Sequence, residues 1–370
     1  MRIVVALDSF KGSLDAVAAC NAAAAGLRSV LHSAEIAVHP MADGGEGTAA
    51  VMLASRRGRW IPVKTVGPLP GMKVDAGFGL FEDGTAIVEM AAASGLTLLR
   101  DEQRNPLLTT TFGTGELLRA AAEKGAQKIR LAVGGSATVD GGAGAASALG
   151  WTFTDKQTTT LCLGGGFLGQ LDSIIRPKAL GLPVVEVLCD VDNPLCGEQG
   201  AARVFGPQKG ATPEMVAQLE AGLQRLADVV EATLGCRIHD LPGGGAAGGL
   251  AAGAVAFMGA KLVSGVDAVV EATRLDDALK GVDWVVTGEG RFDSQSLRGK
   301  VVAGVVRAAK RAGVRVAVVA GSVALSQAEH RACGVEFAVA AKPDTMPLAD
   351  AMAKAPELVK QAGKTLGGLL

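Results

Sequence analysis

Tyrosine is absent from this chain of 370 residues, and all aromatic residues together make up 4% of it. Proteins that bind single-stranded nucleic acid stack bases on aromatic side chains, and this sequence offers few of them. The formal net charge is -1, so the excess of positive charge that attracts a phosphate backbone is also missing. We therefore expect no nucleic-acid partner.

Cysteine and histidine are also scarce, with six and four residues, and the cysteines are scattered without a C-x-x-C pair. This spacing argues against structural zinc and against a disulfide framework. The N-terminal "MRIVVALD" enters a strand pattern at once, without the features of a signal peptide. Apolar runs stay well short of the roughly 18 residues that span a membrane. These absences predict a cytoplasmic protein with reduced thiols and no membrane partner, and the lack of heptad repeats leaves the oligomeric state open.

Several catalytic motifs are missing as well. The sequence contains no G-x-x-x-x-G-K-[ST], no G-x-S-x-G and no H-E-x-x-H, which disfavours a P-loop kinase, an α/β-hydrolase and a zinc protease. Two segments, 164–169 and 243–248, match G-x-G-x-x-G, but neither follows a strand inside a βαβ unit with an acid about 20 residues further on. In a chain with 51 glycines such matches are expected by chance.

The residues that are present predict an α/β protein. Short β-branched runs at 3–7, 35–39, 282–288, 314–321 and 336–341 alternate with alanine-rich helical stretches. This alternation is typical of βαβ units and a parallel sheet. Two N-terminal and three C-terminal strands together predict one five-stranded, doubly wound domain.

The pattern changes between these two groups of strands. Segment 65–91 has the glycine and proline turns of β-hairpins, and strands are expected at 128–133 and 184–190, with a helix opened by Thr212 and Pro213. We predict that residues 65–255 form a second α/β domain inserted into a domain made of residues 1–64 and 256–370. Clefts between domains are preferred ligand sites, so the active site is expected there.

Acids, hydroxyls and glycines gather where the predicted strands end. The five segments concerned are "DSFKGS" (8–13), "PMADGGEGT" (40–48), "GGSATVDGG" (134–142), "DVDNP" (190–194) and "GEGRFDSQS" (288–296). In open α/β sheets ligands bind outside the carboxyl ends of strands. Carboxylates, a few cations and glycine-rich backbone are the groups that phosphoryl transfer uses, because they hold phosphates, bind Mg²⁺ and accept the proton of an attacking hydroxyl.

One of these segments presents a difficulty, because Asp43 and Glu46 stand among glycines whose N–H groups would suit a phosphate. A metal ion or a substrate hydroxyl would allow an acid and a phosphate to share one site. We expect Asp43 to meet such a group. Glu46 is expected either to contact the ligand or to provide favourable charge at a helix N-terminus.

Taken together, these motifs resemble the type 1 glycerate kinases. The similarity rests on "ALDSFKGSL", "PMADGGEGT", "EMAAASGL" (89–96), "TTTFGTGEL" (109–117), "VGGSATVDGGAGAASALG" (133–150), "CDVDNPLCG" (189–197), "VFGPQKGAT" (204–212) and "VVTGEGRFDSQSLRGK" (285–300). The resemblance implies an ATP-dependent kinase that converts D-glycerate to 2-phosphoglycerate and ADP. It also implies a two-domain fold in which a flavodoxin-like or Rossmann-like parallel-sheet domain is interrupted by a second α/β domain. Three alternatives stay open: transfer to the 3-hydroxyl, a two-domain protein that binds a hydroxy acid without chemistry, and a phosphatase.

If glycerate is the substrate, the strand-end residues can be given roles. For substrate binding we predict Asp8, Ser9, Lys11, Asp43 and Arg291, with Lys11 and Arg291 pairing with a carboxylate or phosphate. For catalysis we predict Lys11 and a base, which is Asp190 or, as its rival, Asp43. The predicted phosphate-binding residues are Gly134, Gly135, Ser136, Thr138, Gly288 and Gly290. Mg²⁺ is expected at Asp192 and Glu289, with Asp8 as a further candidate.

Overall fold

Two separate β-sheets organise the chain in a computed structural model that describes residues 1–297 and 299–370. One compact unit, called unit 1 here, comprises residues 1–43, 50–56 and 264–370. The other, unit 2, comprises residues 44–49 and 57–263. The boundaries that we predict after residues 64 and 255 differ from these, since residues 57–64 and 256–263 belong to unit 2.

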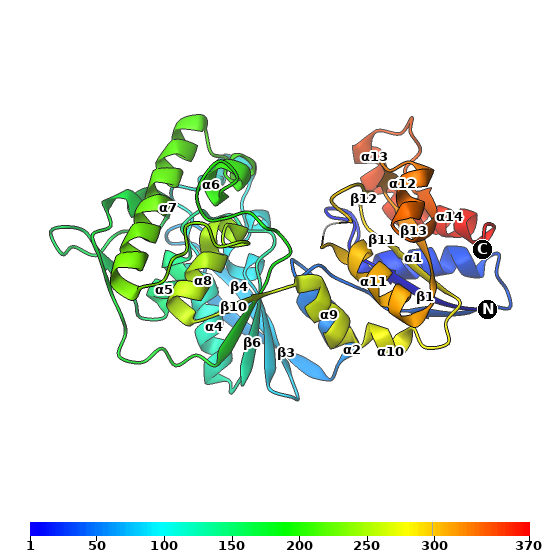
Figure 1. Ribbon diagram of the computed structural model, residues 1–370, viewed down its shortest axis with the longest axis horizontal. Coiled ribbons are helices and arrows are strands. Elements are labelled where there is room, and N and C mark those ends of the chain that lie inside the picture. Colours follow the sequence, from blue (N-terminus) through cyan, green and yellow to red (C-terminus); the bar gives the residue numbers. More distant parts are fainter. Residues whose placement is uncertain (298) are drawn as a thin grey trace. The chain divides into compact units, whose positions relative to one another are not determined.

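Unit 1 is built on a five-stranded parallel sheet with the strand order β15-β13-β11-β1-β2. Figure 1 labels three of these strands, β1, β11 and β13. Its strands are β1 (Arg2–Leu7), β2 (Glu35–Val38), β11 (Trp284–Gly288), β13 (Arg315–Ala320) and β15 (Val335–Ala340). Read from the other edge, two N-terminal strands are followed by three C-terminal ones in the order 2-1-3-4-5, which is the flavodoxin-like order. The predicted doubly wound sheet is therefore confirmed. A further pair of short strands, β12 (Arg291–Phe292) and β14 (Ser322–Val323), joins the segments that follow β11 and β13.

Helices cover both faces of this sheet, and the buried residues of its strands are mostly apolar. In β1, Val4 and Ala6 belong to one core cluster, whereas Ile3, Val5 and Leu7 belong to another. The first cluster includes residues of α9 (Gly265–Thr273), α10 (Leu275–Ala278) and α11 (Val301–Ala312), and the second includes residues of α1 (Ala16–Arg28) and α14 (Ala355–Gly367). Successive side chains of a strand point to opposite faces, so β1, β11, β13 and β15 each contribute to both cores, whereas β2 packs against the second one only. The remaining helices with residues in unit 1 are α2 (Thr48–Ser55), α12 (Gln327–Ala332) and α13 (Leu348–Ala353).

Unit 2 contains a six-stranded mixed sheet with the order β10-β9-β6-β5-β4-β3. The strands are β3 (Gly58–Val66), β4 (Lys73–Phe81), β5 (Thr85–Glu89), β6 (Lys128–Ala132), β9 (Val184–Leu188) and β10 (Lys261–Val263). β3, β4 and β5 run antiparallel through tight turns, as the hairpin pattern of 65–91 predicts, and the other neighbours are parallel. A small antiparallel pair, β7 (Thr152–Thr154) and β8 (Ser173–Ile175), lies outside this sheet.

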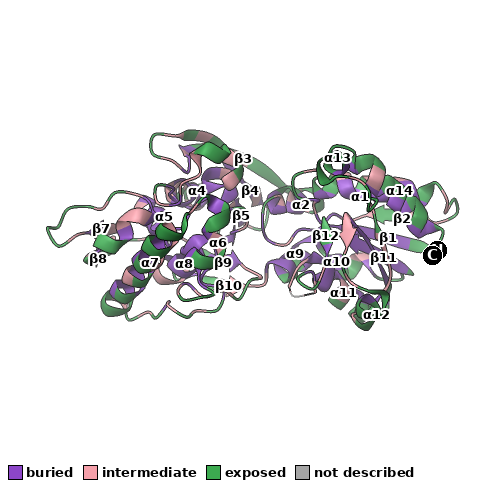
Figure 2. Cartoon of the chain, turned by 90° about the horizontal axis from the view of Figure 1, so that it is seen from above, coloured by how far each residue is buried: buried purple, intermediate pink, exposed green. Residues whose placement is uncertain are grey.

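The helices of unit 2 cover a single large core. They are α3 (Ala91–Ser94), α4 (Phe112–Glu123), α5 (Ala143–Ala148), α6 (Ala201–Phe205), α7 (Pro213–Leu234) and α8 (Leu250–Met258), with five short 3-10 helices at 96–98, 101–103, 165–170, 207–209 and 246–249. The longest, α7, begins where predicted, with the Thr212 hydroxyl accepting from Met215 N and proline in the first turn. Its buried residues recur on one face, which separates an inner from a solvent-exposed side (Figure 2).

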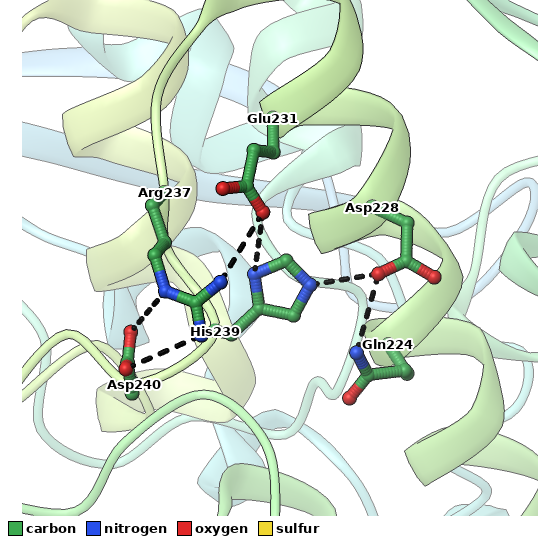
Figure 3. Close-up of polar contacts among 6 residues, drawn as sticks. All are labelled: Gln224, Asp228, Glu231, Arg237, His239 and Asp240. Carbon is green, nitrogen blue, oxygen red and sulfur yellow. Dashed lines mark hydrogen bonds and ion pairs between the residues drawn. The ribbon is translucent and has the colours of Figure 1, made fainter.

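The C-terminal half of α7 is tied to the chain that follows it by a small charged network (Figure 3). The His239 ring lies 2.8 Å from the Asp228 carboxylate through Nε2, and Arg237 pairs with Glu231 and Asp240. The hydrogen bond to His239 lowers the pKa of Asp228. Because these contacts connect residues of α7 to the segment 237–240, they fix where the chain turns back toward α8.

The fold class predicted from the sequence is confirmed: a doubly wound parallel-sheet domain is interrupted by a second α/β domain. Across residues 1–297 and 299–370, no helix has both the length and the hydrophobicity needed to cross a bilayer.

Candidate active site

The carboxyl ends of β1 and β11 meet at the topological switch point of unit 1, where the strand order reverses and a ligand crevice is expected. Leu7 is paired with Gly288, and the Asp8 N–H donates to the Gly288 carbonyl at 2.8 Å. Asp8 and Glu289, the residues that follow these two strands, therefore lie close together. Both are nearly enclosed, with 5% and 7% of their surface exposed.

Three acids and two lysines make up the charged cluster at this point. Lys11 Nζ lies 3.5 Å from the Asp43 carboxylate, and Lys300 Nζ lies 3.5 Å from that of Glu289. Burial and, after it, the negative charge of Asp43 raise the pKa of Asp8 to about 8. Burial also raises the pKa of Glu289, while Asp43 is the main cause of the raised pKa of Lys11. These two effects favour the protonated form of Asp8, in which its carboxyl group can donate a hydrogen bond.

A cavity of about 610 Å³ opens beside this cluster, and unit 1 alone lines it. Its lining contains six residues that the sequence predicts for the site: Asp8, Ser9, Lys11, Glu289, Gly290 and Arg291. Ser9 N donates to the Asp8 carboxylate at 2.6 Å, and Arg291 Nε pairs with Asp293 at 3.1 Å. The pairing of β12 with β14 holds Arg291 at the rim.

The two predicted glycines of this region have different environments. A Cβ on Gly288 would come 1.7 Å from the Val319 carbonyl oxygen, so glycine is needed there for the close approach of β11 and β13. Gly290 lines the cavity, and a Cβ there would find its nearest neighbour at 3.8 Å. Gly288 therefore has a packing role of its own, whereas Gly290 leaves backbone accessible to a ligand.

The predicted glycine-rich loop 134–138 belongs to unit 2 and follows β6. Gly135 is exposed and has a φ of +75°, a conformation that favours glycine. Beneath it lies Lys209, whose ammonium group donates to Ser136 Oγ and to the Thr138 carbonyl, both at 2.7 Å. Lys209 is only 2% exposed, and this burial lowers its pKa to about 7. Thr138 is itself fully buried, so the accessible part of the loop is Gly134 and Gly135.

Asp140 fixes the far end of the same loop. Its carboxylate accepts from the Thr111 N–H at 2.8 Å and the Thr111 hydroxyl at 2.9 Å, and from the N–H groups of Gly142 and Gly144. Burial raises its pKa, and these donors oppose the rise. The loop is therefore anchored between a buried lysine and a buried aspartate.

The acid-containing glycine segment 44–47 lies against this loop. A Cβ on Gly134 would come 2.7 Å from Gly45 Cα, so the two glycine-rich backbones are in direct contact. Glu89, the last residue of β5, accepts from Gly47 N and Ala49 N at 3.3 and 2.6 Å, and so caps the start of α2. The Glu46 carboxylate is directed toward Gly135. Glu89, rather than Glu46, supplies the charge that serves the helix N-terminus.

Asp190 and Asp192 follow β9 in unit 2, with Asp190 half-buried and Asp192 exposed. The predicted residues thus fall into two groups. Asp8, Ser9, Lys11, Asp43, Gly288, Glu289, Gly290 and Arg291 belong to unit 1, and Gly134, Gly135, Ser136, Thr138, Asp190 and Asp192 belong to unit 2. Within unit 1, the structure brings Asp8, Lys11, Asp43 and Glu289 together as predicted. Their roles, and a site shared by the two groups, stay predictions.

Four residues that support the candidate site or its loops were not predicted: Glu89, Asp140, Lys209 and Lys300. Each lies inside a segment used for the resemblance, but for Glu89, Asp140 and Lys209 nothing local distinguishes a site residue from a helix cap or a solvated lysine. Lys300 offered a signal, since it directly precedes the α11 helix that follows β11 and its acidic loop.

Within residues 1–297 and 299–370, no group of three or more His, Cys, Asp or Glu side chains is arranged to hold a metal ion. Glu289 still fits the role of a single protein ligand to a metal ion, because its Oε1 is buried and has no hydrogen-bond partner among the described residues. Carboxylate oxygens are the ligands that Mg²⁺ prefers, and Mg²⁺ often takes only one or two of them together with substrate phosphates.

Comparison with known proteins gives a consistent result. A model of the "Glycerate kinase family" matches residues 3–370. The "Glycerate kinase" of Halalkalibacterium halodurans is 44% identical over 98% of this chain and 97% of its own length. The "Glycerate 2-kinase" of Escherichia coli K12 is 45% identical over 87% of this chain and 86% of its own. A crystal structure from Salmonella typhimurium LT2, assigned as a glycerate kinase 2, is 42% identical, covers 100% of this chain and 98% of its own, and superposes with a TM-score of 0.83.

Proposed function

Because this chain belongs to the glycerate kinase family and is a kinase, we propose that it transfers the γ-phosphoryl group of ATP to the 2-hydroxyl of D-glycerate. The products are 2-phosphoglycerate and ADP. The observation that carries this proposal is the cluster of Asp8, Lys11, Asp43 and Glu289 beside a cavity at the switch point of unit 1. The 45% identity to a glycerate 2-kinase favours the 2-position. Membership in a kinase family leaves no support for a phosphatase or for a binding protein without chemistry.

In the transfer, the glycerate hydroxyl oxygen forms a bond to the γ-phosphorus, and the bond between that phosphorus and the β-γ bridging oxygen breaks, leaving ADP. The hydroxyl proton passes to an aspartate, for which we propose Asp190, with Asp43 as the rival. An aspartate is a weak base, but proton transfer is late in a loose phosphoryl transfer, so its position matters more than its pKa.

The remaining proposed roles concern charge and orientation. Lys11 and Arg291 would pair with the glycerate carboxylate or with phosphate, and Asp8 and Ser9 would orient the substrate. Because burial and the charge of Asp43 raise the pKa of Asp8 and so favour its protonated form, Asp8 is suited to donate a hydrogen bond to a substrate oxygen. Gly134, Gly135 and the Gly288–Gly290 turn would present backbone to phosphates, with Ser136 and Thr138 fixing the first of these loops.

We propose Mg²⁺ as the metal, with Glu289 as a protein ligand in unit 1 and Asp192 as a candidate in unit 2. When bound, it would neutralise negative charge on the phosphate oxygens. The buried, unpartnered Oε1 of Glu289 supports the first of these assignments.

One assay tests the proposal. Purified protein is incubated with D-glycerate, ATP and Mg²⁺, ADP is followed, and the phosphate position is assigned by ³¹P NMR. We expect ADP formation that depends on D-glycerate, with phosphate on the 2-position. Absence of glycerate-dependent ADP would overturn the kinase assignment for this substrate, and phosphate on the 3-position would replace the proposed product. L-glycerate serves as the matched control substrate.

A further inference from the structure

The cavity of unit 1 has an apolar wall that the chemistry of glycerate does not explain. This wall comes from α13 and the first turns of α14, and its residues are Leu348, Ala351, Met352, Ala355, Leu358 and Val359. Their spacing of three and four residues places them on one side of a helical stretch. Leu348 is 68% exposed and Met352 is 36% exposed, so large apolar surface faces solvent at the cavity.

The opposite wall is polar and includes Asp8, Lys11, Glu289 and Lys300. Met352 of the apolar wall lies close to the turn after β1, since a Cβ on Gly12 in that turn would lie 2.9 Å from Met352 Cε. Lys342 donates to the carbonyls of Pro343 and Met346 at 3.0 and 3.1 Å, which fixes the loop that leads into α13. The apolar wall therefore lies next to the turn that carries Asp8 and Lys11.

Glycerate has three carbons, a carboxylate and two hydroxyls, and thus has little apolar surface to bury. A volume of about 610 Å³ falls in the range of pockets that enclose ligands several times larger. The combination of an apolar wall and a charged wall suits a ligand with a flat heterocycle at one end and anionic groups at the other. Among the proposed substrates only ATP has this form.

We propose that this cavity is the nucleoside site of the enzyme, with the purine ring against α13 and α14 and the phosphates directed toward Lys300 and the Gly288–Gly290 turn. The inference rests on the proposed use of ATP and adds the place of its base. Gly290 lines the cavity and leaves room for a close approach of phosphate oxygens. Lys300, which lies 3.5 Å from Glu289, provides positive charge beside it.

The test places a bulky side chain on the apolar wall and measures the affinity for nucleotide and the KM for glycerate separately. Ala351 is 7% exposed and lines the cavity, so Ala351→Phe places a ring where the purine is proposed to lie. We expect the Kd for ADP, measured by calorimetry, and the KM for ATP to rise by about tenfold or more, while the KM for D-glycerate changes by less than about twofold. Ala353→Phe is the matched control, because Ala353 lies on the same helix, is exposed and does not line the cavity.

A second variant separates lost binding from lost folding. Leu348 is largely exposed, so Leu348→Glu should leave the melting temperature within about 2 °C of the wild type while weakening ADP binding by about tenfold. Leu369→Glu, at a 50% exposed leucine that does not line the cavity, serves as its control. Unchanged ADP affinity in both cavity variants, or a rise in the KM for glycerate alone, would overturn the proposal. Because ADP binding is measured without turnover, this result is distinct from a failure of the wild-type kinase assay.

Discussion

At the residue scale, some side chains of the candidate site could be predicted from the sequence and others could not. Asp8, Lys11, Asp43 and Glu289 were predicted to lie together because each follows a strand of one parallel sheet, and such strands end at the same edge. Asp140 and Lys209 were not predicted, since their roles depend on burial by parts of the chain distant in sequence. A lysine between glutamine and glycine is usually solvated, and only the fold places this one beneath a loop.

The identity of the base is a residue-scale prediction. If Asp190 accepts the hydroxyl proton, Asp190→Asn should lower kcat by about 100-fold or more, because general-base catalysis contributes at least that much. The Kd for ADP should stay unchanged. Steady-state kinetics and calorimetry measure the two effects. Asp75→Asn, at an exposed aspartate of β4 in unit 2 that has no proposed role, is the control. Near-normal turnover in D190N would transfer the role to Asp43.

Lys209 gives a prediction about pH and stability. Its pKa is about 7 in the folded protein, against an ordinary value of 10.5, so between these values the unfolded chain binds a proton that the folded chain does not. The contribution of Lys209 to the free energy of unfolding therefore rises with pH, by up to about 1.4 kcal/mol per pH unit. We expect wild type to gain stability relative to Lys209→Met between about pH 7 and 10, and to show no such trend below pH 6.

Chemical denaturation of both proteins across this pH range measures the difference. Lys124→Met, at an exposed lysine that follows α4, should track the wild type throughout. A stability difference between wild type and K209M that stays constant from pH 6 to 10 would mean that Lys209 is charged in the folded protein over this whole range.

At the scale of elements, the strands of unit 1 and the start of α7 were predictable because their patterns are local. The strands of unit 1 and the start of α7 agree with the expected ranges within about two residues, since apolar runs and the Thr-Pro cap mark them directly. The C-terminal stretch was less informative. Its apolar residues at 348, 351, 352 and 355 have helical spacing, but the sequence alone does not tell what they face, so the apolar wall of the cavity was missed.

The packing of α1 against α14 supports a prediction at this scale. The two helices approach through Gly26 and Gly363, and a Cβ on Gly26 would lie 2.0 Å from the Lys360 carbonyl oxygen. Gly26→Ala should therefore destabilise unit 1 by about 2 kcal/mol or more, despite the better helix propensity of alanine. Because α14 also forms part of the cavity wall, the KM for ATP should rise.

Gly169→Ala is the matched control, since Gly169 is exposed and a Cβ there would meet nothing within 4 Å. Its stability should stay within about 0.5 kcal/mol of the wild type. Thermal unfolding and ATP kinetics of both variants provide the measurement. A Gly26→Ala protein as stable as Gly169→Ala would show that α14 moves away from α1 without cost.

At the scale of the whole molecule, the two-domain organisation was predictable from the change in sequence pattern, and its bounds were less so. Residues 57–64 continue a strand that pairs with β4, and this long-range pairing is invisible in the local pattern that placed them in the first domain. Each of the three clusters of buried apolar residues belongs to one unit. Separate cores favour separate unfolding transitions in a protein of this size.

This organisation makes the nucleoside site testable in the intact chain. ADP that binds only to folded unit 1 stabilises that unit by RT ln(1 + [L]/Kd), or about 2.7 kcal/mol at 100 times the Kd. For a domain of this size, each kcal/mol raises the melting temperature by about 2–4 °C. We therefore expect differential scanning calorimetry to show one transition that moves up by several degrees with ADP and one that moves much less. Gly26→Ala identifies the first, because it should lower the transition of unit 1 alone. If ADP instead raised only the transition that Gly26→Ala leaves unchanged, the nucleotide would bind through unit 2, and the loop anchored by Lys209 and Asp140 would become its site.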